Sequence, residues 1–162
     1  MSMLETYIES MTFNRSRTLG LLDRAVELSP TALGWRPAEG RAHVAWQLMH
    51  VGVTEELFGT ERLRSGATPR FADVWERFRG GSTVDDNVPT TDQIRELLHG
   101  SRELLLTTLR TFDDSQMNDI VFPERDWTLA TVLQVLCWHE AHHHGQAHIT
   151  LNMAETTLKN LS

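Results

Sequence analysis

The sequence predicts an all-α protein, a four-helix bundle with a long connection between its second and third helices. Four stretches carry apolar residues every three or four positions, the periodicity of a helix with one buried side. No stretch shows the sustained alternation of polar and apolar residues that is typical of a half-buried strand. Because 162 residues can bury one substantial core, we expect a single bundle domain over residues 1–162.

Capping and stop signals place the first three helices. The first should begin after Ser2, which opens a Ser-x-x-Glu capping pattern, and should end at residues 29–30, Ser-Pro. The second is predicted over about residues 41–65, where a glycine follows. The third follows a capping box that begins at Thr90, and its apolar side runs over residues 94–112.

The connection from Gly66 to Pro89 is longer than loops between bundle helices usually are. It contains a short amphipathic turn formed by Phe71, Val74, Trp75 and Phe78. Loops of this length commonly act as lids, whereas the Gly-Gly-Ser run at residues 80–82 favours a partly ordered surface excursion. The sequence leaves both interpretations open.

The fourth helix is predicted over residues 129–151, with Thr128 as its N-cap, and it carries five of the eight histidines. His139 and His143 are spaced i, i+4, so their imidazoles project from the expected core side, one turn apart. A lone core histidine is usually a neutral, hydrogen-bonded ring, but this pair has the geometry of two ligands of one metal. The others are expected at the surface or at an interface: His142, His144 and His148.

His50 is the candidate for a third ligand. It lies at the centre of the apolar side of the second helix, which reads His43, Trp46, His50, Val53 and Leu57. A metal site with an open position typically has three protein ligands. We therefore predict that His50, His139 and His143 hold one divalent ion. Zinc and nickel both suit imidazole ligands, so the residues leave the choice open.

Composition excludes several classes of protein. Fifteen basic against twenty-two acidic residues give a formal charge of −7, which argues against a surface that binds nucleic acid. No apolar run is long enough to span a membrane, and the N-terminus lacks the apolar region of a signal peptide. Cys137 is the only cysteine, so we expect a reducing compartment, a cytoplasmic protein, and a packing role for this thiol.

Residues 139–143 also match His-Glu-x-x-His, the zinc-protease signature in which the glutamate is a general base. The metzincin pattern needs a glycine and a histidine three and six residues after the second histidine, where this chain has Gln146 and Ile149. This mismatch argues against a protease. Glu140 could orient a ligand, act as a base, or form an ion pair with a neighbouring helix.

Three segments together resemble the DinB-like superfamily, which includes bacillithiol S-transferases and mycothiol-dependent maleylpyruvate isomerases. They are the tryptophan-proline segment at residues 34–37, the inward histidine at the end of residues 46–50, and the His-x-x-x-His-x-Gly-Gln of residues 139–146. The resemblance implies a four-helix bundle, a divalent metal held by His50, His139 and His143, and often a homodimer. Activity transfers less readily, because one fold hosts many functions.

The leading functional hypothesis is a metal-dependent enzyme acting on a small molecule, with transfer of a low-molecular-weight thiol as its reaction. A thiol that reaches the open metal position would ionise more readily and could attack an electrophile. The alternative is a non-catalytic, dimeric metal-binding bundle with a role in stress response. A third class, nucleic-acid binding, is suggested only by the superfamily's damage-inducible name, and the acidic charge disfavours it.

Overall fold

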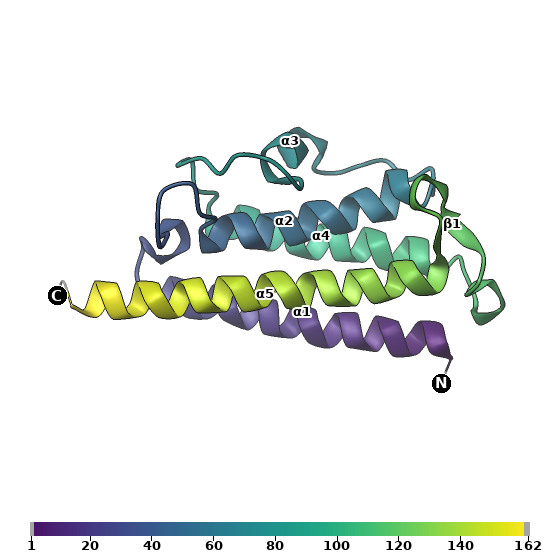
Figure 1. The fold of residues 1–162 in the computed structure, drawn as a ribbon, viewed down its shortest axis with the longest axis horizontal. Coiled ribbons are helices and arrows are strands. Elements are labelled where there is room, and N and C mark those ends of the chain that lie inside the picture. The colour runs from purple at the N-terminus through teal and green to yellow at the C-terminus, as the bar shows by residue number, and fades with distance from the viewer. Residues whose placement is uncertain (1, 161–162) are drawn as a thin grey trace.

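Four long helices lie side by side in the computed structural model, which describes residues 2–160 (Figure 1). They are α1 (Met3–Leu28), α2 (Val44–Leu57), α4 (Thr91–Leu109) and α5 (Leu129–Lys159). Helix α5 packs against both α1 and α2, and α2 also packs against α4. The prediction of an all-α protein built as a helical bundle is confirmed.

Three of these helices begin at the residues that their capping patterns predict. Ser2 Oγ accepts a hydrogen bond from the Glu5 N–H at 3.1 Å. Thr90 and Gln93 make both hydrogen bonds of a capping box, and Thr128 caps α5. Each cap pairs an N–H group that the first turn of a helix leaves without an intrahelical partner. Local sequence therefore determines where these helices start.

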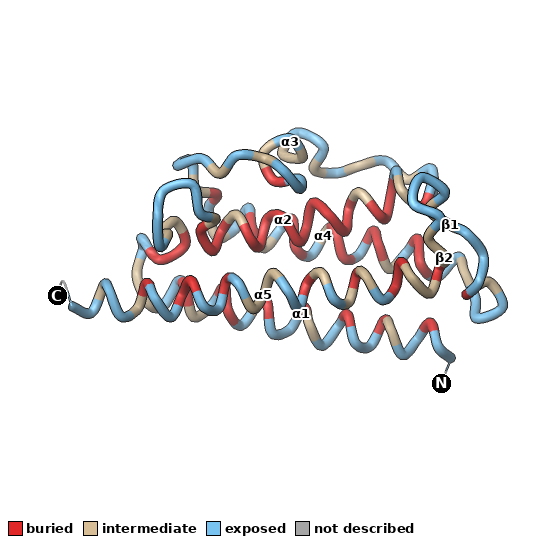
Figure 2. The backbone as a smooth tube through the Cα atoms, viewed as in Figure 1, coloured by how far each residue is buried: buried red, intermediate tan, exposed pale blue. Residues whose placement is uncertain are grey.

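The core lies between the helices, and α2 is buried along almost its whole length (Figure 2). Only Trp46 and Leu57 of this helix are half-buried. The bundle covers one side of α2, and the connection between α2 and α4 covers the other (Figure 1). This connection contains the turns η3 (Ala72–Val74) and α3 (Trp75–Phe78).

A buried carboxylate ties this connection to the bundle. Glu56 accepts hydrogen bonds from the Arg70 N–H at 2.6 Å and from the Trp75 indole N–H at 2.7 Å. Phe78 is buried against the core. Residues 70–78 of the connection are therefore packed against α2, whereas most of residues 79–87 are exposed.

The second helix differs from its predicted bounds of 41–65. His43 is not on the helix but caps it, because its backbone is extended and its Nδ1 accepts from the Trp46 N–H at 3.0 Å. After Leu57 the chain widens into a π-helical turn, η2 (Phe58–Arg62). The α4 backbone at Leu105 approaches the Cα of Gly59 so closely that a side chain there would be crowded. Close packing against α4 therefore accompanies the change in helical geometry.

Two further elements differ from the sequence-based expectation. Helix α5 continues two turns past residue 151, to Lys159. A small antiparallel hairpin precedes it, formed by β1 (Ile120–Phe122) and β2 (Trp127–Thr128) around the turn η5 (Pro123–Arg125). These strands are too short to show an alternating pattern.

The turns that join the remaining elements are η1 (Ala32–Gly34), after α1, and η4 (Asp114–Gln116), after α4. The Asp114 carboxylate accepts hydrogen bonds from the Met3 and Leu4 N–H groups at 2.8 and 2.9 Å, which ties η4 to the start of α1. None of the helices within residues 2–160 is both long and apolar enough to cross a membrane.

Candidate metal centre

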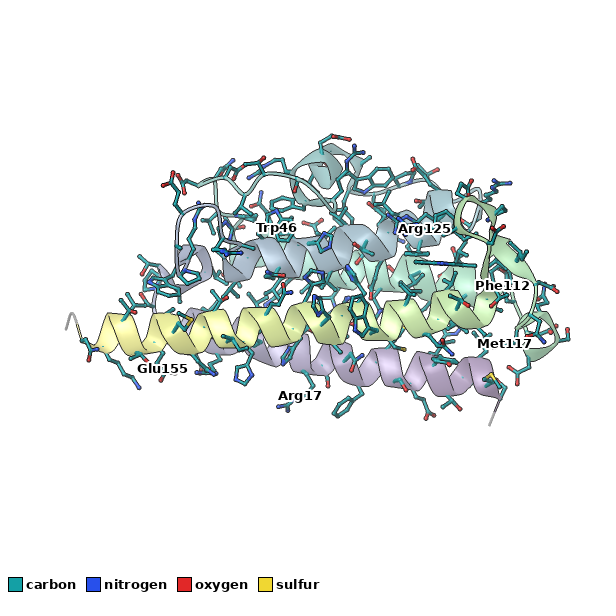
Figure 3. All side chains as sticks on the ribbon, viewed as in Figure 1. Arg17, Trp46, Phe112, Met117, Arg125 and Glu155 are labelled. Atoms are coloured by element: carbon teal, nitrogen blue, oxygen red, sulfur yellow. The ribbon has the colours of Figure 1, made fainter. Side chains whose placement is uncertain are left out.

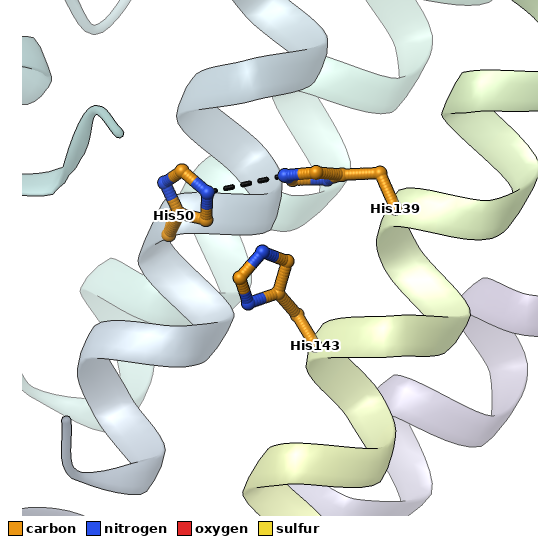
Figure 4. A group of neighbouring side chains, drawn as sticks. All are labelled: His50, His139 and His143. Carbon is orange, nitrogen blue, oxygen red and sulfur yellow. Dashed lines mark hydrogen bonds between the residues drawn. The ribbon is translucent and has the colours of Figure 1, made fainter. Parts of the chain in front are cut away.

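The structure brings together the three histidines that the sequence singled out. His50 comes from α2, and His139 and His143 come from successive turns of α5 (Figure 4). Each residue offers one ring nitrogen, and the three nitrogens lie within 4.8 Å of one another. The Nε2 atoms of His50 and His139 are 3.1 Å apart. Within residues 2–160, no other three histidine, cysteine or acidic side chains form such a group.

Neighbouring groups fix the orientation and the tautomer of two of these rings. The Phe78 carbonyl lies 2.6 Å from His50 Nδ1, and a carbonyl only accepts, so Nδ1 carries the proton and Nε2 presents its lone pair. The Gln47 side-chain oxygen lies 2.5 Å from His143 Nδ1 and leaves His143 Nε2 free to coordinate in the same way. Metal-binding histidines typically have such outer partners.

Further contacts restrain His50 and His139. The ring of Trp46 stacks on His50 at a centroid distance of 4.9 Å and an angle of 11°. The Thr54 hydroxyl lies 3.5 Å from His139 Nε2. Because both rings are held by packing as well as by hydrogen bonds, these side chains would lose little conformational entropy when a ligand binds.

All three imidazoles are neutral at physiological pH. Burial lowers the pKa of His139 to about 4, and the nearby His50 ring adds to this effect. Burial and the two other rings lower the pKa of His143 to about 3. Burial also lowers the pKa of His50, although its hydrogen bond to a carbonyl opposes the shift. A neutral imidazole is the form that coordinates a metal, so the donor set fits a divalent ion.

The centre is reached from one side of the bundle. His50 and His139 line a cleft of about 320 Å³ that lies between α2, its π-helical turn and the hairpin before α5. A small molecule in this cleft would contact the imidazoles of His50 and His139 directly.

Glu140, the glutamate of the protease-like motif, is not part of this cleft. It is 1% exposed, and its two oxygens accept hydrogen bonds from Arg15 Nε at 2.7 Å and from Arg102 Nη2 at 2.6 Å. Glu55 pairs with the same two arginines and completes a buried network of two acids and two bases. Of the roles that the sequence left open for Glu140, the structure therefore shows the ion pair.

The charges within this network stabilise one another. Burial alone would raise the pKa of Glu55, but the guanidinium groups of Arg15 and Arg102 outweigh it and hold that pKa below its ordinary value. Sequence reasoning missed Arg15, Glu55 and Arg102. One signal was available for Arg15, which interrupts the apolar side of α1 between Met11 and Thr18.

The remaining histidines of α5 lie outside the centre. His142 and His148 are exposed, as expected for surface positions, whereas His144 is half-buried. Cys137 is also half-buried, and burial raises the pKa of its thiol to about 11. A thiol in that environment is protonated and unreactive, so a packing role fits it.

The fold and this site together define a helical bundle with a three-histidine candidate metal centre. The sequence model of the DinB superfamily matches residues 11–147, a span that includes all three histidines. The chain therefore belongs to the DinB superfamily. No curated protein and no solved structure gives a significant match to the chain.

Proposed function

We propose that this protein is a divalent-metal-dependent enzyme that acts on small molecules, with His50, His139 and His143 as the metal ligands. The observation that carries the proposal is the grouping of three neutral imidazoles within 4.8 Å of one another, two of which, His50 and His139, line an open cleft. Three imidazoles leave at least one coordination position for a substrate. Zinc and nickel are the candidate ions, since both suit nitrogen ligands.

The reaction we propose is transfer of a low-molecular-weight thiol to an electrophile. A bound divalent ion would lower the pKa of a thiol that reaches its open position. The thiol sulfur then forms a bond to an electrophilic carbon, the bond from that carbon to its leaving group breaks, and the thiol proton departs with the leaving group. No oxidant or reductant is needed. The choice of thiol follows the resemblance to the S-transferases of this superfamily.

We also propose that the protein forms a homodimer through the outer side of α1 and α5. Phe13 on α1 is 65% exposed and Trp138 on α5 is 60% exposed. Ala141, one turn after Trp138, lines the same shallow depression as Phe13, so the two large side chains belong to one surface. Large apolar side chains on a shared surface are typical of protein–protein contacts.

Metal analysis of single variants tests the ligand assignment. We expect the purified protein to bind about one equivalent of zinc or nickel, and His50→Ala, His139→Ala and His143→Ala each to lose most of it. The matched control replaces His142, His144 and His148 together, and it should retain full occupancy. If all three single variants still carry about one equivalent of metal, the assignment is wrong.

A cobalt-substituted sample tests the thiol step separately. Adding bacillithiol, mycothiol or a simple analogue should produce a sulfur-to-cobalt charge-transfer band, and the band should vanish in His50→Ala. Thiol consumption against a panel of electrophiles then measures turnover. A spectrum that no thiol changes at millimolar concentrations would contradict thiol transfer while leaving metal binding intact.

A further inference from the structure

We propose that the cleft beside the histidines binds a small organic anion, whose charged group pairs with Arg62 and Arg125 and whose apolar part lies against aromatic rings. The inference names the substrate class of the proposed enzyme and in that sense rests on the proposed function.

The lining of the cleft is basic and aromatic. Beyond the two histidines it includes Phe58, Arg62, Phe122, Arg125 and Trp127. No aspartate or glutamate lines it, although the chain as a whole has a formal charge of −7. A positive cleft on an acidic protein concentrates the field on small anions and favours their entry.

Neither arginine has a charged partner of its own. Within residues 2–160, neither Arg62 nor Arg125 forms an ion pair, whereas the neighbouring Arg64 pairs with Glu124 at 2.8 Å. Arg62 is partly buried, and this burial and the charge of Arg125 lower its pKa, although the nearby Glu61 carboxylate opposes the shift. Two unpaired guanidinium groups that repel each other across a cleft would both gain from one anion between them.

Aromatic rings hold both guanidinium groups in place. Arg62 Cζ lies 4.6 Å from the ring centroid of Phe58, and Arg125 Cζ lies 5.2 Å from that of Trp127. Stacking of this kind orients the planar fork while leaving its N–H groups free to donate. The arginines are therefore presented to the cleft without being neutralised.

Two irregular backbone elements, a π-helical turn and a hairpin turn, place these arginines at the cleft. Arg62 ends the π-helical turn after α2, and such turns occur often at functional sites. Arg125 ends the turn of the hairpin, towards the end of the bundle at which α5 begins (Figure 3). Asp126, which follows, adopts a left-handed conformation with φ of 53°. Arg125 lines the cleft from this turn.

The shape of the cleft limits the ligand. A volume of about 320 Å³ lies at the small end of the range for ligand pockets, so the ligand is small. The Phe58, Phe122 and Trp127 rings suit an aryl or alkyl portion. The guanidinium groups suit a carboxylate or a phosphate monoester equally. With its charge at the arginines, the ligand would extend towards His50 and His139.

Calorimetry with matched probes tests this assignment. The probes are 3-phenylpropanoate, the neutral amide of the same shape, and phenyl phosphate, and each is titrated into metal-free protein so that an ion cannot hold the anion. We expect at least one anion to bind about tenfold or more tightly than the amide, which corresponds to one charge-assisted hydrogen bond. Comparison of the two anions shows which oxyanion the site prefers.

Two variants and one control locate the effect. Arg62→Gln and Arg125→Gln should each weaken anion binding by about tenfold and leave amide binding unchanged. Arg64→Gln removes the same charge outside the cleft, so it should change anion binding less than twofold. Equal affinity for anion and amide, no binding of any anion at millimolar concentrations, or an Arg62→Gln variant that behaves like the control would each overturn the proposal.

The outcomes separate this inference from the proposed function. Anion preference in a protein that fails to bind metal would contradict the enzyme proposal and leave the anion site standing. Metal binding without anion preference would contradict the anion site and leave the enzyme proposal standing. Unchanged thermal unfolding of the three arginine variants would show that altered affinity is not a result of altered folding.

Discussion

Glu140→Gln should destabilise the fold strongly and leave the metal centre intact. The substitution keeps the shape of the side chain but removes a charge that is 1% exposed and that lies 2.7 and 2.6 Å from two guanidinium nitrogens. Arg15 and Arg102 would then share Glu55 alone, which leaves one buried positive charge uncompensated. Removing one partner of a buried ion pair costs about 3–5 kcal/mol. The amide oxygen of glutamine can still accept one of the two hydrogen bonds, whereas its NH2 group cannot accept the other, so we expect a cost of about 3–4 kcal/mol.

Urea unfolding followed by circular dichroism measures the effect. With a slope of about 2 kcal/mol per molar urea, a loss of about 3–4 kcal/mol moves the midpoint down by about 1.5–2 M. The matched control is Glu55→Gln, which removes the other acid of the network and lies outside the protease-like motif. It should destabilise the fold by a similar amount, and both variants should bind metal with unchanged stoichiometry.

One result would refute this reasoning. If Glu140→Gln unfolded at the wild-type urea concentration but lost metal or turnover, Glu140 would act at the metal centre rather than in the network. A large difference between Glu140→Gln and Glu55→Gln would show that the four charges do not act as one unit.

Two further predictions concern the metal and the dimer. Chelation should lower the melting temperature by about 5–10 °C without abolishing folding, because an ion at a hundredfold excess over its dissociation constant stabilises the folded state by about 2.7 kcal/mol and the bundle has a core of its own. Scanning calorimetry with and without chelator measures this shift. Complete unfolding on chelation would mark the site as structural. Trp138→Asp should shift the mass seen by light scattering from that of two chains to that of one chain of 18.5 kDa, and an unchanged mass would show that the exposed side of α1 and α5 is not the interface.

The long helices could be predicted because their signals are local. The caps at Ser2, Thr90 and Thr128 each act within one turn of chain, and an apolar periodicity needs no knowledge of its partner helix. The grouping of His139 and His143 is local for the same reason, since their spacing places both on one side of any helix. The placement of His50 beside them needed only the assumption that apolar sides meet in the core.

Features that depend on contacts between helices could not be predicted in this way. The buried network joins Arg15, Glu55, Arg102 and Glu140, one from each long helix. Apart from Arg15, which interrupts the apolar side of α1, each looks like an ordinary charged residue within its own segment. The π-helical turn accompanies the close approach of α4 at Gly59. The arginines of the cleft depend on this turn and on a hairpin whose strands are too short to be visible in the sequence.

In the protease-like motif, the adjacent residues His139 and Glu140 of α5 face different partners and have different roles. Successive residues of a helix point about 100° apart, so neighbours in sequence do not face the same partner. His139 faces α2 and the open cleft, whereas Glu140 points between α1 and α4, where its charge is neutralised by Arg15 and Arg102. A general base must lie within reach of the substrate, whereas Glu140 does not line the cleft, is 1% exposed, and has both oxygens accepting from guanidinium groups. The pattern His-Glu-x-x-His thus arises here from two separate requirements, metal-type donors on one side of α5 and a buried ion-pair partner on another.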